Sequence, residues 1–208
     1  MGFLGKLFSK PSEAQKPVDI PVIVVSGLPR SGTSMMMKIL EAGGLEILTD
    51  NERTADEDNP KGYYEFEVVK ELPGNADATW LVGAGGKVVK IISFLLQHLP
   101  ASYQYKVVFM RRNVEEILAS QRQMLIRRGE STAEDDGKMA ETFQEHLKRV
   151  RVWLANQNNI QVLYVDYNAL MNSPTEPVNA LVDFLGIPLD VEKMLAVPDA
   201  SLYRNRKQ

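Results

Sequence analysis

The residues with the most specific chemistry lie at positions 26–34, SGLPRSGTS. Gly27, Gly32 and Ser34 match the glycine, glycine and serine of the phosphate-binding pattern G-x-x-x-x-G-K-[ST]. Thr33 stands where that pattern has its lysine, and the cation is found inside the loop, at Arg30. Because the missing lysine serves the outer phosphates of a triphosphate, the loop predicts a shorter ligand, with one 5′-phosphate and one group beyond it.

The flanking segments predict that this loop joins a strand to a helix. Residues 21–27 form a short, apolar, β-branched run that ends in glycine, and residues 31–42 are typical of a helix that two glycines terminate. A helix N-terminus after a glycine turn exposes unpaired N–H groups and the positive end of the helix dipole, which favours an anion. The side-chain donors beside these N–H groups are Arg30, Ser31, Thr33 and Ser34.

A second candidate anion site follows another apolar strand, in FMRRNVEEILASQ. Arg112 would stand at the strand end, and Ser120 follows eight positions later. An arginine there and a serine about two helical turns on can converge on one anion. Arg111 competes for the same role. The alternative is a solvated basic helix face, because further arginines follow at 122, 127 and 128.

The remaining pattern places these residues in an α/β fold. Strands are expected at 21–27, 87–92, 105–110 and 160–167, and helices at 31–42, 113–128, 139–156 and 175–188. Strands that alternate with helices predict a P-loop-like, doubly wound, mainly parallel sheet flanked by helices. A chain of 208 residues suits a single domain, which we expect at residues 20–208 after a flexible tail at 1–19.

The amino-acid composition limits the expected cellular location and binding partners of the protein. The net charge of −3 argues against general affinity for nucleic acid. The chain has no cysteine, which excludes disulfides and thiolate metal sites and fits a cytoplasmic location. No apolar run approaches the roughly 20 residues of a membrane span. Stable membrane insertion is therefore not expected, and the apolar residues of the tail would give at most weak peripheral contact. No metal-binding spacing is present.

The two motifs resemble those of the sulfotransferases that use 3′-phosphoadenosine-5′-phosphosulfate (PAPS). LPRSGTS is similar to the family's 5′-phosphosulfate loop, in the arginine version of tyrosylprotein and many bacterial members. In the family, the residues that match Arg112 and Ser120 hold the 3′-phosphate, although Val114 replaces the usual proline. Residues 162–188 resemble the family's strand, tyrosine and helix before FLGI, which implies that Tyr167 lies near the adenine or is a packed core residue.

The resemblance implies transfer of a sulfuryl group from PAPS to a hydroxyl or amine of a small-molecule, peptide or glycan acceptor. Arg30 would stabilise charge on the moving group, and Lys90 resembles the catalytic-strand lysine of cytosolic members. Ile92 occupies the position of their catalytic histidine, so the histidine mechanism does not carry over. Cytosolic members also cover the 3′-phosphate with a C-terminal basic segment, for which Arg204 and Arg206 are the available substitutes.

The general base therefore has to be sought elsewhere, and the resemblance to glutamate-dependent members directs attention to residues 49–67. Glu65 is the preferred candidate, narrowly ahead of Glu52, which is closer to the tyrosylprotein pattern, and Glu67 is a third. A loop whose acidic side chains only meet solvent is the competing interpretation. The two histidines, His98 and His146, are expected to be structural.

Two other functions stay open at this point. A P-loop nucleotide kinase or NTPase would use Asp166 after its apolar strand, but Thr33 argues against it. A non-catalytic nucleotide-binding module is the second alternative, and it would explain the absent histidine.

Overall fold

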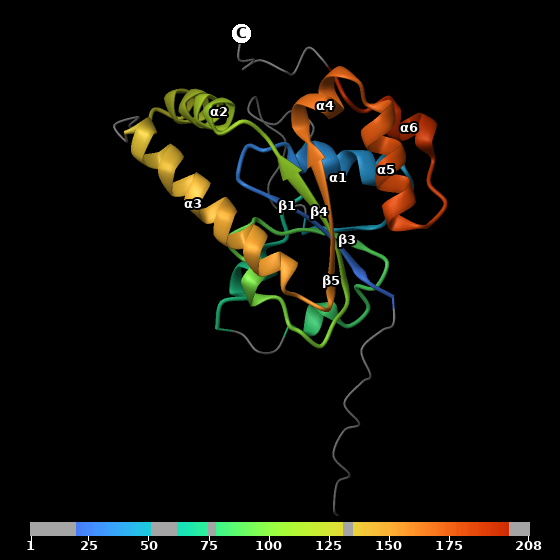
Figure 1. The fold of residues 1–208 in the computed structure, drawn as a ribbon. Coiled ribbons are helices and arrows are strands. Elements are labelled where there is room, and N and C mark those ends of the chain that lie inside the picture. Colours follow the sequence, from blue (N-terminus) through green and yellow to red (C-terminus); the bar gives the residue numbers. More distant parts are fainter. Residues whose placement is uncertain (1–19, 51–61, 75–77, 131–134, 200–208) are drawn as a thin grey trace, which may run out of the picture.

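A computed structural model describes residues 20–50, 62–74, 78–130 and 135–199, and the expected tail at 1–19 lies outside these ranges. Five strands form one sheet in the order β2-β3-β1-β4-β5, and every neighbouring pair is parallel (Figure 1). The α/β architecture predicted above is therefore confirmed. The strands are β1 (Val22–Gly27), β2 (Ile47–Leu48), β3 (Val88–Lys90), β4 (Tyr105–Arg111) and β5 (Ile160–Asp166).

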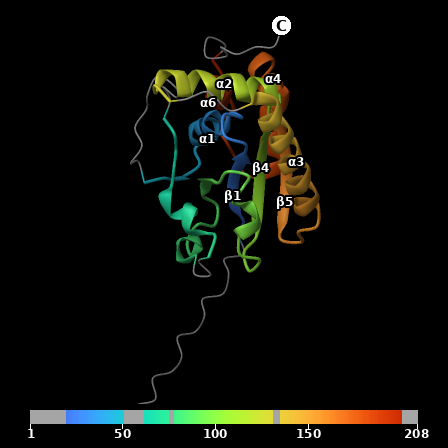
Figure 2. The same ribbon diagram turned by 90° about the vertical axis from the view of Figure 1, so that its left-hand side faces the viewer.

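Helices cover both faces of this sheet. In Figure 1, α3 lies against one face while α1, α5 and α6 lie against the other, and Figure 2 shows α2 crossing above the carboxyl ends of the strands. The α-helices are α1 (Thr33–Ala42), α2 (Val114–Arg127), α3 (Asp136–Ala155), α4 (Tyr167–Asn172), α5 (Thr175–Leu185) and α6 (Val191–Leu195). Short 3₁₀ turns occur at η1 (Glu67–Glu71), η2 (Thr79–Leu81) and η3 (Leu96–His98).

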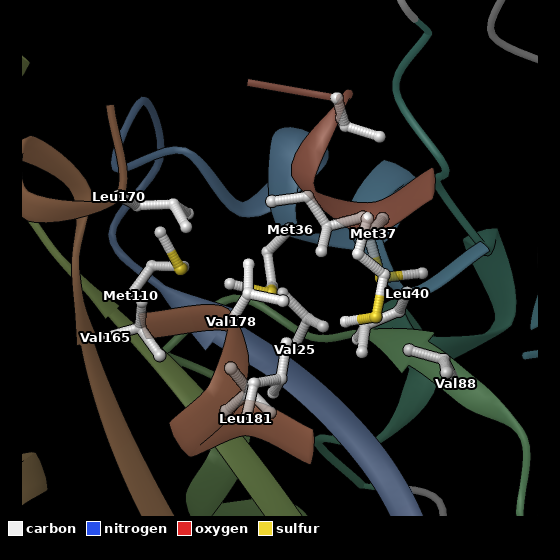
Figure 3. Packing of buried hydrophobic residues seen from close by; sticks show 14 of the residues in the cluster. Val25, Met36, Met37, Leu40, Val88, Met110, Val165, Leu170, Val178 and Leu181 are labelled. Carbon is white, nitrogen blue, oxygen red and sulfur yellow. The ribbon is translucent and has the colours of Figure 1, made fainter. Parts of the chain in front are cut away.

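The core beneath α1 fixes the direction of that helix. Met36, Met37 and Leu40 are fully buried there and meet Val178 and Leu181 of α5 over the middle of the sheet (Figure 3). Truncating one such side chain to alanine typically costs about 2–5 kcal/mol. This packing holds the N-terminus of α1 at the end of β1, where the glycine-containing loop lies.

On the opposite face, α3 is tied to the same loop through a histidine. The Nε2 atom of His146 lies 2.9 Å from Ser93 Oγ, and its ring stacks on Phe94 at 3.8 Å between centroids. The Ser93 N–H donates to the Gly27 carbonyl at 3.0 Å. Burial, and secondarily Arg149, lowers the pKa of His146, so the ring is neutral at neutral pH. This histidine is part of the packing that supports the loop.

The start of α4 differs from the sequence expectation. Residues 160–167 were expected as one strand, but β5 ends at Asp166 and Tyr167 begins α4. The Asp166 carboxylate accepts hydrogen bonds from the N–H groups of Asn168 and Ala169, at 3.0 and 3.1 Å. This N-cap turns the chain into a helix, and it gives Asp166 a structural role.

The loop and α4 touch at Gly32, which leads to a stability prediction. Gly32 and Gly44 both have left-handed φ values, 97° and 100°. Alanine would bring backbone strain of about 1–2 kcal/mol at either position. At Gly32 the added Cβ would also lie 2.5 Å from Tyr167 Cδ2, whereas Gly44 has no atom within 4 Å.

Gly32→Ala is therefore expected to lower the free energy of unfolding by about 1–3 kcal/mol more than Gly44→Ala, because of this overpacking. Urea unfolding of the two variants beside the wild type measures the difference. Equal losses would mean that Tyr167 does not pack against the loop.

Candidate functional site

The loop between β1 and α1 has strained backbone. Within the described residues, only Arg30 and Tyr64 combine a non-glycine side chain with a positive φ, at 68° and 52°. Such conformations cost about 1–3 kcal/mol each, and they persist where surrounding contacts impose them. Arg30 lies in the loop, and Tyr64 lies beside α1, where its hydroxyl meets Glu41. Both strained residues therefore flank the helix whose N-terminus was predicted to bind an anion.

Arg30 and Arg112 connect the loop to α2. Arg30 Nε donates to Ser120 Oγ at 3.0 Å, and Arg112 Nη1 donates to the Arg30 carbonyl at 3.1 Å. The guanidinium carbon of Arg112 lies 4.2 Å from the centroid of the Tyr167 ring. Four residues that were selected from two separate motifs and a tyrosine match are thus brought together at one edge of the sheet.

The two neighbouring arginines of β4 and its following turn have different surroundings. The Arg112 side chain is 7% exposed, so it does not belong to a solvated basic face. Arg111 is exposed and lies over the Tyr164 ring, which packs into the cluster on the α3 side of the sheet. Strand alternation sends adjacent side chains in opposite directions, and only Arg112 reaches the loop.

Two residues of this cluster were missed by the sequence interpretation. Glu116 is buried, and its Oε2 accepts from Arg112 Nε at 3.0 Å. Its Oε1 accepts from Asn168 Nδ2 at 3.1 Å. Neither Glu116 nor Asn168 was given a role in the site from the sequence. The four-residue spacing from Arg112, which directly precedes the N-cap residue Asn113, was the available signal, since side chains about one helical turn apart can meet.

Lys90, Ser34 and the segment that contains Glu65 form a second cluster. Lys90 Nζ donates to the Tyr63 carbonyl, and Ser34 Oγ donates to the same oxygen at 3.4 Å. The Glu65 carbonyl accepts from Thr49 Oγ1 at 2.8 Å, and Glu65 is partly exposed. The segment is therefore held both against the start of α1 and against the residues that follow β2.

Tyr64 fixes the same segment further along α1. Its hydroxyl donates to Glu41 Oε2 at 2.8 Å, and Glu41 pairs with Lys38 at 2.7 Å. Burial and the Glu41 carboxylate raise the pKa of Tyr64 to about 12. The hydroxyl therefore stays protonated at neutral pH and keeps donating to Glu41.

Buried polar atoms without a partner gather around the loop. In the described part of the chain, three buried side-chain atoms lack a hydrogen bond: Ser26 Oγ, Ser31 Oγ and Asn168 Oδ1. Ser26 is the penultimate residue of β1, Ser31 lies within the loop and Asn168 contacts Glu116. Buried polar atoms are normally satisfied, so unpartnered oxygens in the loop and in the elements beside it fit a site that takes a polar ligand.

Some predicted residues are not part of either cluster. Glu52, Arg204 and Arg206 lie outside the described residues. Glu67 is described, and its carboxylate pairs with Lys70 at 2.6 Å.

Two further features are absent from the described ranges. No group of three or more histidine, aspartate or glutamate side chains there could hold a metal ion. No helix in those ranges has the length and apolar character to cross a membrane.

Comparison with solved structures gives the same fold. The sulfotransferase domain of the Synechococcus PCC 7002 olefin synthase matches 96% of this chain and 83% of its own, with TM-score 0.54 and 17% identity. Mouse sulfotransferase SULT7A1, solved in complex with PAP, matches 90% of this chain and 65% of its own, with TM-score 0.54 and 17% identity. Sulfotransferase STF1 of Mycobacterium tuberculosis H37Rv matches 86% of this chain and 70% of its own, with TM-score 0.58 and 20% identity.

The family assignment comes from the sequence itself. No curated protein matches the chain significantly. The sequence model described as "Sulfotransferase family" matches residues 49–191, which is more than half of the chain. The match begins after the loop at 26–34, so the role of the loop depends on its geometry. The kinase alternative gains no support, and the chain belongs to the sulfotransferase family of sulfuryl-transferring enzymes.

Proposed function

We propose that this chain binds PAPS at the N-terminus of α1 and transfers its sulfuryl group to a hydroxyl or amine of an acceptor. Family membership supports the reaction class. The observation that carries the donor site is the hydrogen-bonded contact of Arg30 with both Arg112 and Ser120. This contact places the loop next to the second anion motif. A single ligand with two anionic ends can reach both motifs only if they lie close together.

The loop would hold the 5′ end of the donor. Gly32 precedes α1 and no side chain caps that helix, so its first N–H groups are available to an anion. Ser31 Oγ, a buried hydroxyl without a partner in the described residues, is a further donor at this point. Thr33 and Ser34 follow in the first turn of the helix. A bound 5′-phosphosulfate would satisfy these groups together.

Arg112 and Ser120 would hold the 3′-phosphate. The guanidinium of Arg112 is largely shielded from water, where a charge-assisted hydrogen bond is stronger than at an exposed surface. Tyr167 is 7% exposed, packed between Gly32 and Arg112. Its burial favours a role in holding Arg112 against the loop. The adenine would lie beside Tyr167. Arg204 and Arg206 stay proposed contacts to the same phosphate.

When bound, PAPS supplies the sulfuryl group and a phosphate leaving group. Arg30 and the α1 N–H groups would stabilise negative charge on the group in transit, and Lys90 would do so at the leaving oxygen. A carboxylate oxygen of Glu65 would accept the proton of the acceptor, with Glu52 as the alternative base. Lys90 and Glu65 belong to one cluster through Tyr63, which supports giving them adjacent roles.

The proposal also includes the type of acceptor and the cellular location. We expect a small-molecule, peptide or glycan acceptor with a neutral or cationic surface, because the residues at 48–64 are rich in acidic side chains. No metal ion has a part in the proposed chemistry. A cytoplasmic location fits a chain without cysteine.

Donor recognition is tested first by binding. The wild type is expected to bind adenosine 3′,5′-bisphosphate about 10- to 100-fold more tightly than 5′-AMP, since a hydrogen bond to a charged group contributes about 1.5–3 kcal/mol. Arg112→Ala should remove most of this preference, as measured by titration calorimetry.

Arg111→Ala is the matched control, because it removes the same charge one position away and should leave the preference intact. Tight binding of ATP–Mg²⁺ with indifference to the bisphosphate would contradict the proposal. If Arg111→Ala loses as much of the preference as Arg112→Ala, Arg112 contributes only its positive charge and not a specific contact to the 3′-phosphate.

The catalytic roles are tested by kinetics with PAPS and a pooled acceptor library. Glu65→Gln is expected to lower kcat by about 10²- to 10⁴-fold, the usual contribution of a general base, with bisphosphate affinity unchanged. Lys90→Ala should lower kcat by about 10²- to 10³-fold. Glu67→Gln, an acidic neighbour paired with Lys70, should keep full activity.

If Glu65→Gln is as active as the wild type, the base is another residue. If wild-type product never exceeds that of a Lys90→Ala, Glu65→Ala double variant, the chain is a binding module.

A further inference from the structure

Glu116 is a buried carboxylate that the proposed reaction does not use. Its side chain is 3% exposed, and it lies in the first turn of α2, beside the arginine proposed to bind the 3′-phosphate. A buried ion pair is weak evidence for stability, because desolvation offsets much of the attraction. The position of this carboxylate therefore calls for another explanation.

The hydrogen bonds of Glu116 join two helices across the guanidinium. One carboxylate oxygen accepts from Arg112 Nε at 3.0 Å, and the other accepts from Asn168 Nδ2 at 3.1 Å. Asn168 lies in α4, directly after Tyr167 and within the turn that Asp166 caps. Glu116 is thereby itself held from both sides and cannot rotate freely.

Three contacts together define the plane of the Arg112 guanidinium. Glu116 binds its Nε, the Arg30 carbonyl binds its Nη1 at 3.1 Å, and the Tyr167 ring lies against its face at 4.2 Å. A planar fork donates to an oxyanion only in its own plane. Fixing the plane therefore fixes the direction from which a phosphate is bound.

An arginine that acted only through its charge would attract phosphate better without a carboxylate beside it. The pairing reduces that attraction and supplies orientation instead. We propose that Glu116 is a positioning residue that holds Arg112 in the orientation for the 3′-phosphate, and this inference rests on the function proposed above. Its effect should appear specifically in the discrimination between nucleotides with and without a 3′-phosphate.

Asn168 makes it feasible to separate orientation from charge. Its Oδ1 is buried without a partner in the described residues. In Glu116→Gln, the new amide oxygen still accepts from Arg112, and a flipped Asn168 amide presents that unpaired oxygen to the glutamine N–H₂. The glutamine variant thus keeps a hydrogen bond to each of Arg112 and Asn168 and loses the charge, whereas Glu116→Ala loses the charge and both of these bonds.

The test compares affinities for adenosine 3′,5′-bisphosphate and 5′-AMP in the full chain, by titration calorimetry. The ratio of the two dissociation constants should fall at least tenfold in Glu116→Ala and less than threefold in Glu116→Gln. Affinity for 5′-AMP should stay within about twofold in both variants. A general loss of structure would instead weaken the binding of both nucleotides to the same extent and leave the ratio of their dissociation constants unchanged.

An unchanged ratio in Glu116→Ala would overturn the inference. A glutamine variant that loses as much as the alanine variant would overturn it too, because charge would then be the property that matters. If Glu116→Ala does not fold, Asn168→Ala is the deciding variant, since it removes the Asn168 hydrogen bond to one carboxylate oxygen and keeps the bond to Arg112. The ratio is then expected to fall about threefold, and no fall would overturn the inference. A wild type that ignores the 3′-phosphate would count against the proposed function instead.

Discussion

The guanidinium of Arg112 is the interaction on which the arrangement of this site depends. It binds the carbonyl of Arg30 in the loop, the carboxylate of Glu116 in α2 and the ring of Tyr167 in α4. Three segments that are far apart in the sequence are thereby held at one point. The Arg112 side chain is largely shielded from water, and in such surroundings hydrogen bonds to charged groups are stronger than in water. Without this arginine, the loop, α2 and α4 would each lose a partner.

The parallel sheet explains why the site can form from these segments. In a parallel sheet every strand delivers its carboxyl end to the same edge, and ligands bind beyond that edge. The central strand β1 leads to the loop, and its neighbours β3 and β4 lead to Lys90 and Arg112. The two faces then secure the loop separately, with α1 packed on the methionine-rich core and α3 fixed through His146 and Ser93. The fold thus places the proposed site residues before any ligand contributes.

The sequence predicted the parts of this account that have a strong local pattern. Buried β-branched runs gave four of the five strands, and helical spacing gave α1, α2, α3 and α5 within a few residues. β2 was missed because two residues carry no periodicity. α4 was not predicted, and its first residue, Tyr167, was assigned to the preceding strand, because the cap of this short helix is a single aspartate. The motif spacing selected Arg30, Arg112 and Ser120, which do lie together.

Other features have no sequence signal strong enough to find them. Lys90 and Ser34 both donate hydrogen bonds to the main-chain carbonyl of residue 63. Any residue type at that position would supply this oxygen, so the sequence does not reveal it. The bond between Glu116 and Asn168 joins residues 52 positions apart, so it depends on tertiary structure alone. The strained φ of Arg30 and Tyr64 likewise results from surrounding contacts, since neither residue type favours that conformation.

A crystal structure of the chain with adenosine 3′,5′-bisphosphate would show whether one nucleotide spans the loop and Arg112. The proposed site predicts the 5′-phosphate on the N–H groups at the start of α1, and the 3′-phosphate within hydrogen-bond distance of Arg112 and Ser120. A nucleotide bound at another edge of the sheet, or one whose 3′-phosphate extends into solvent away from Arg112, would contradict it.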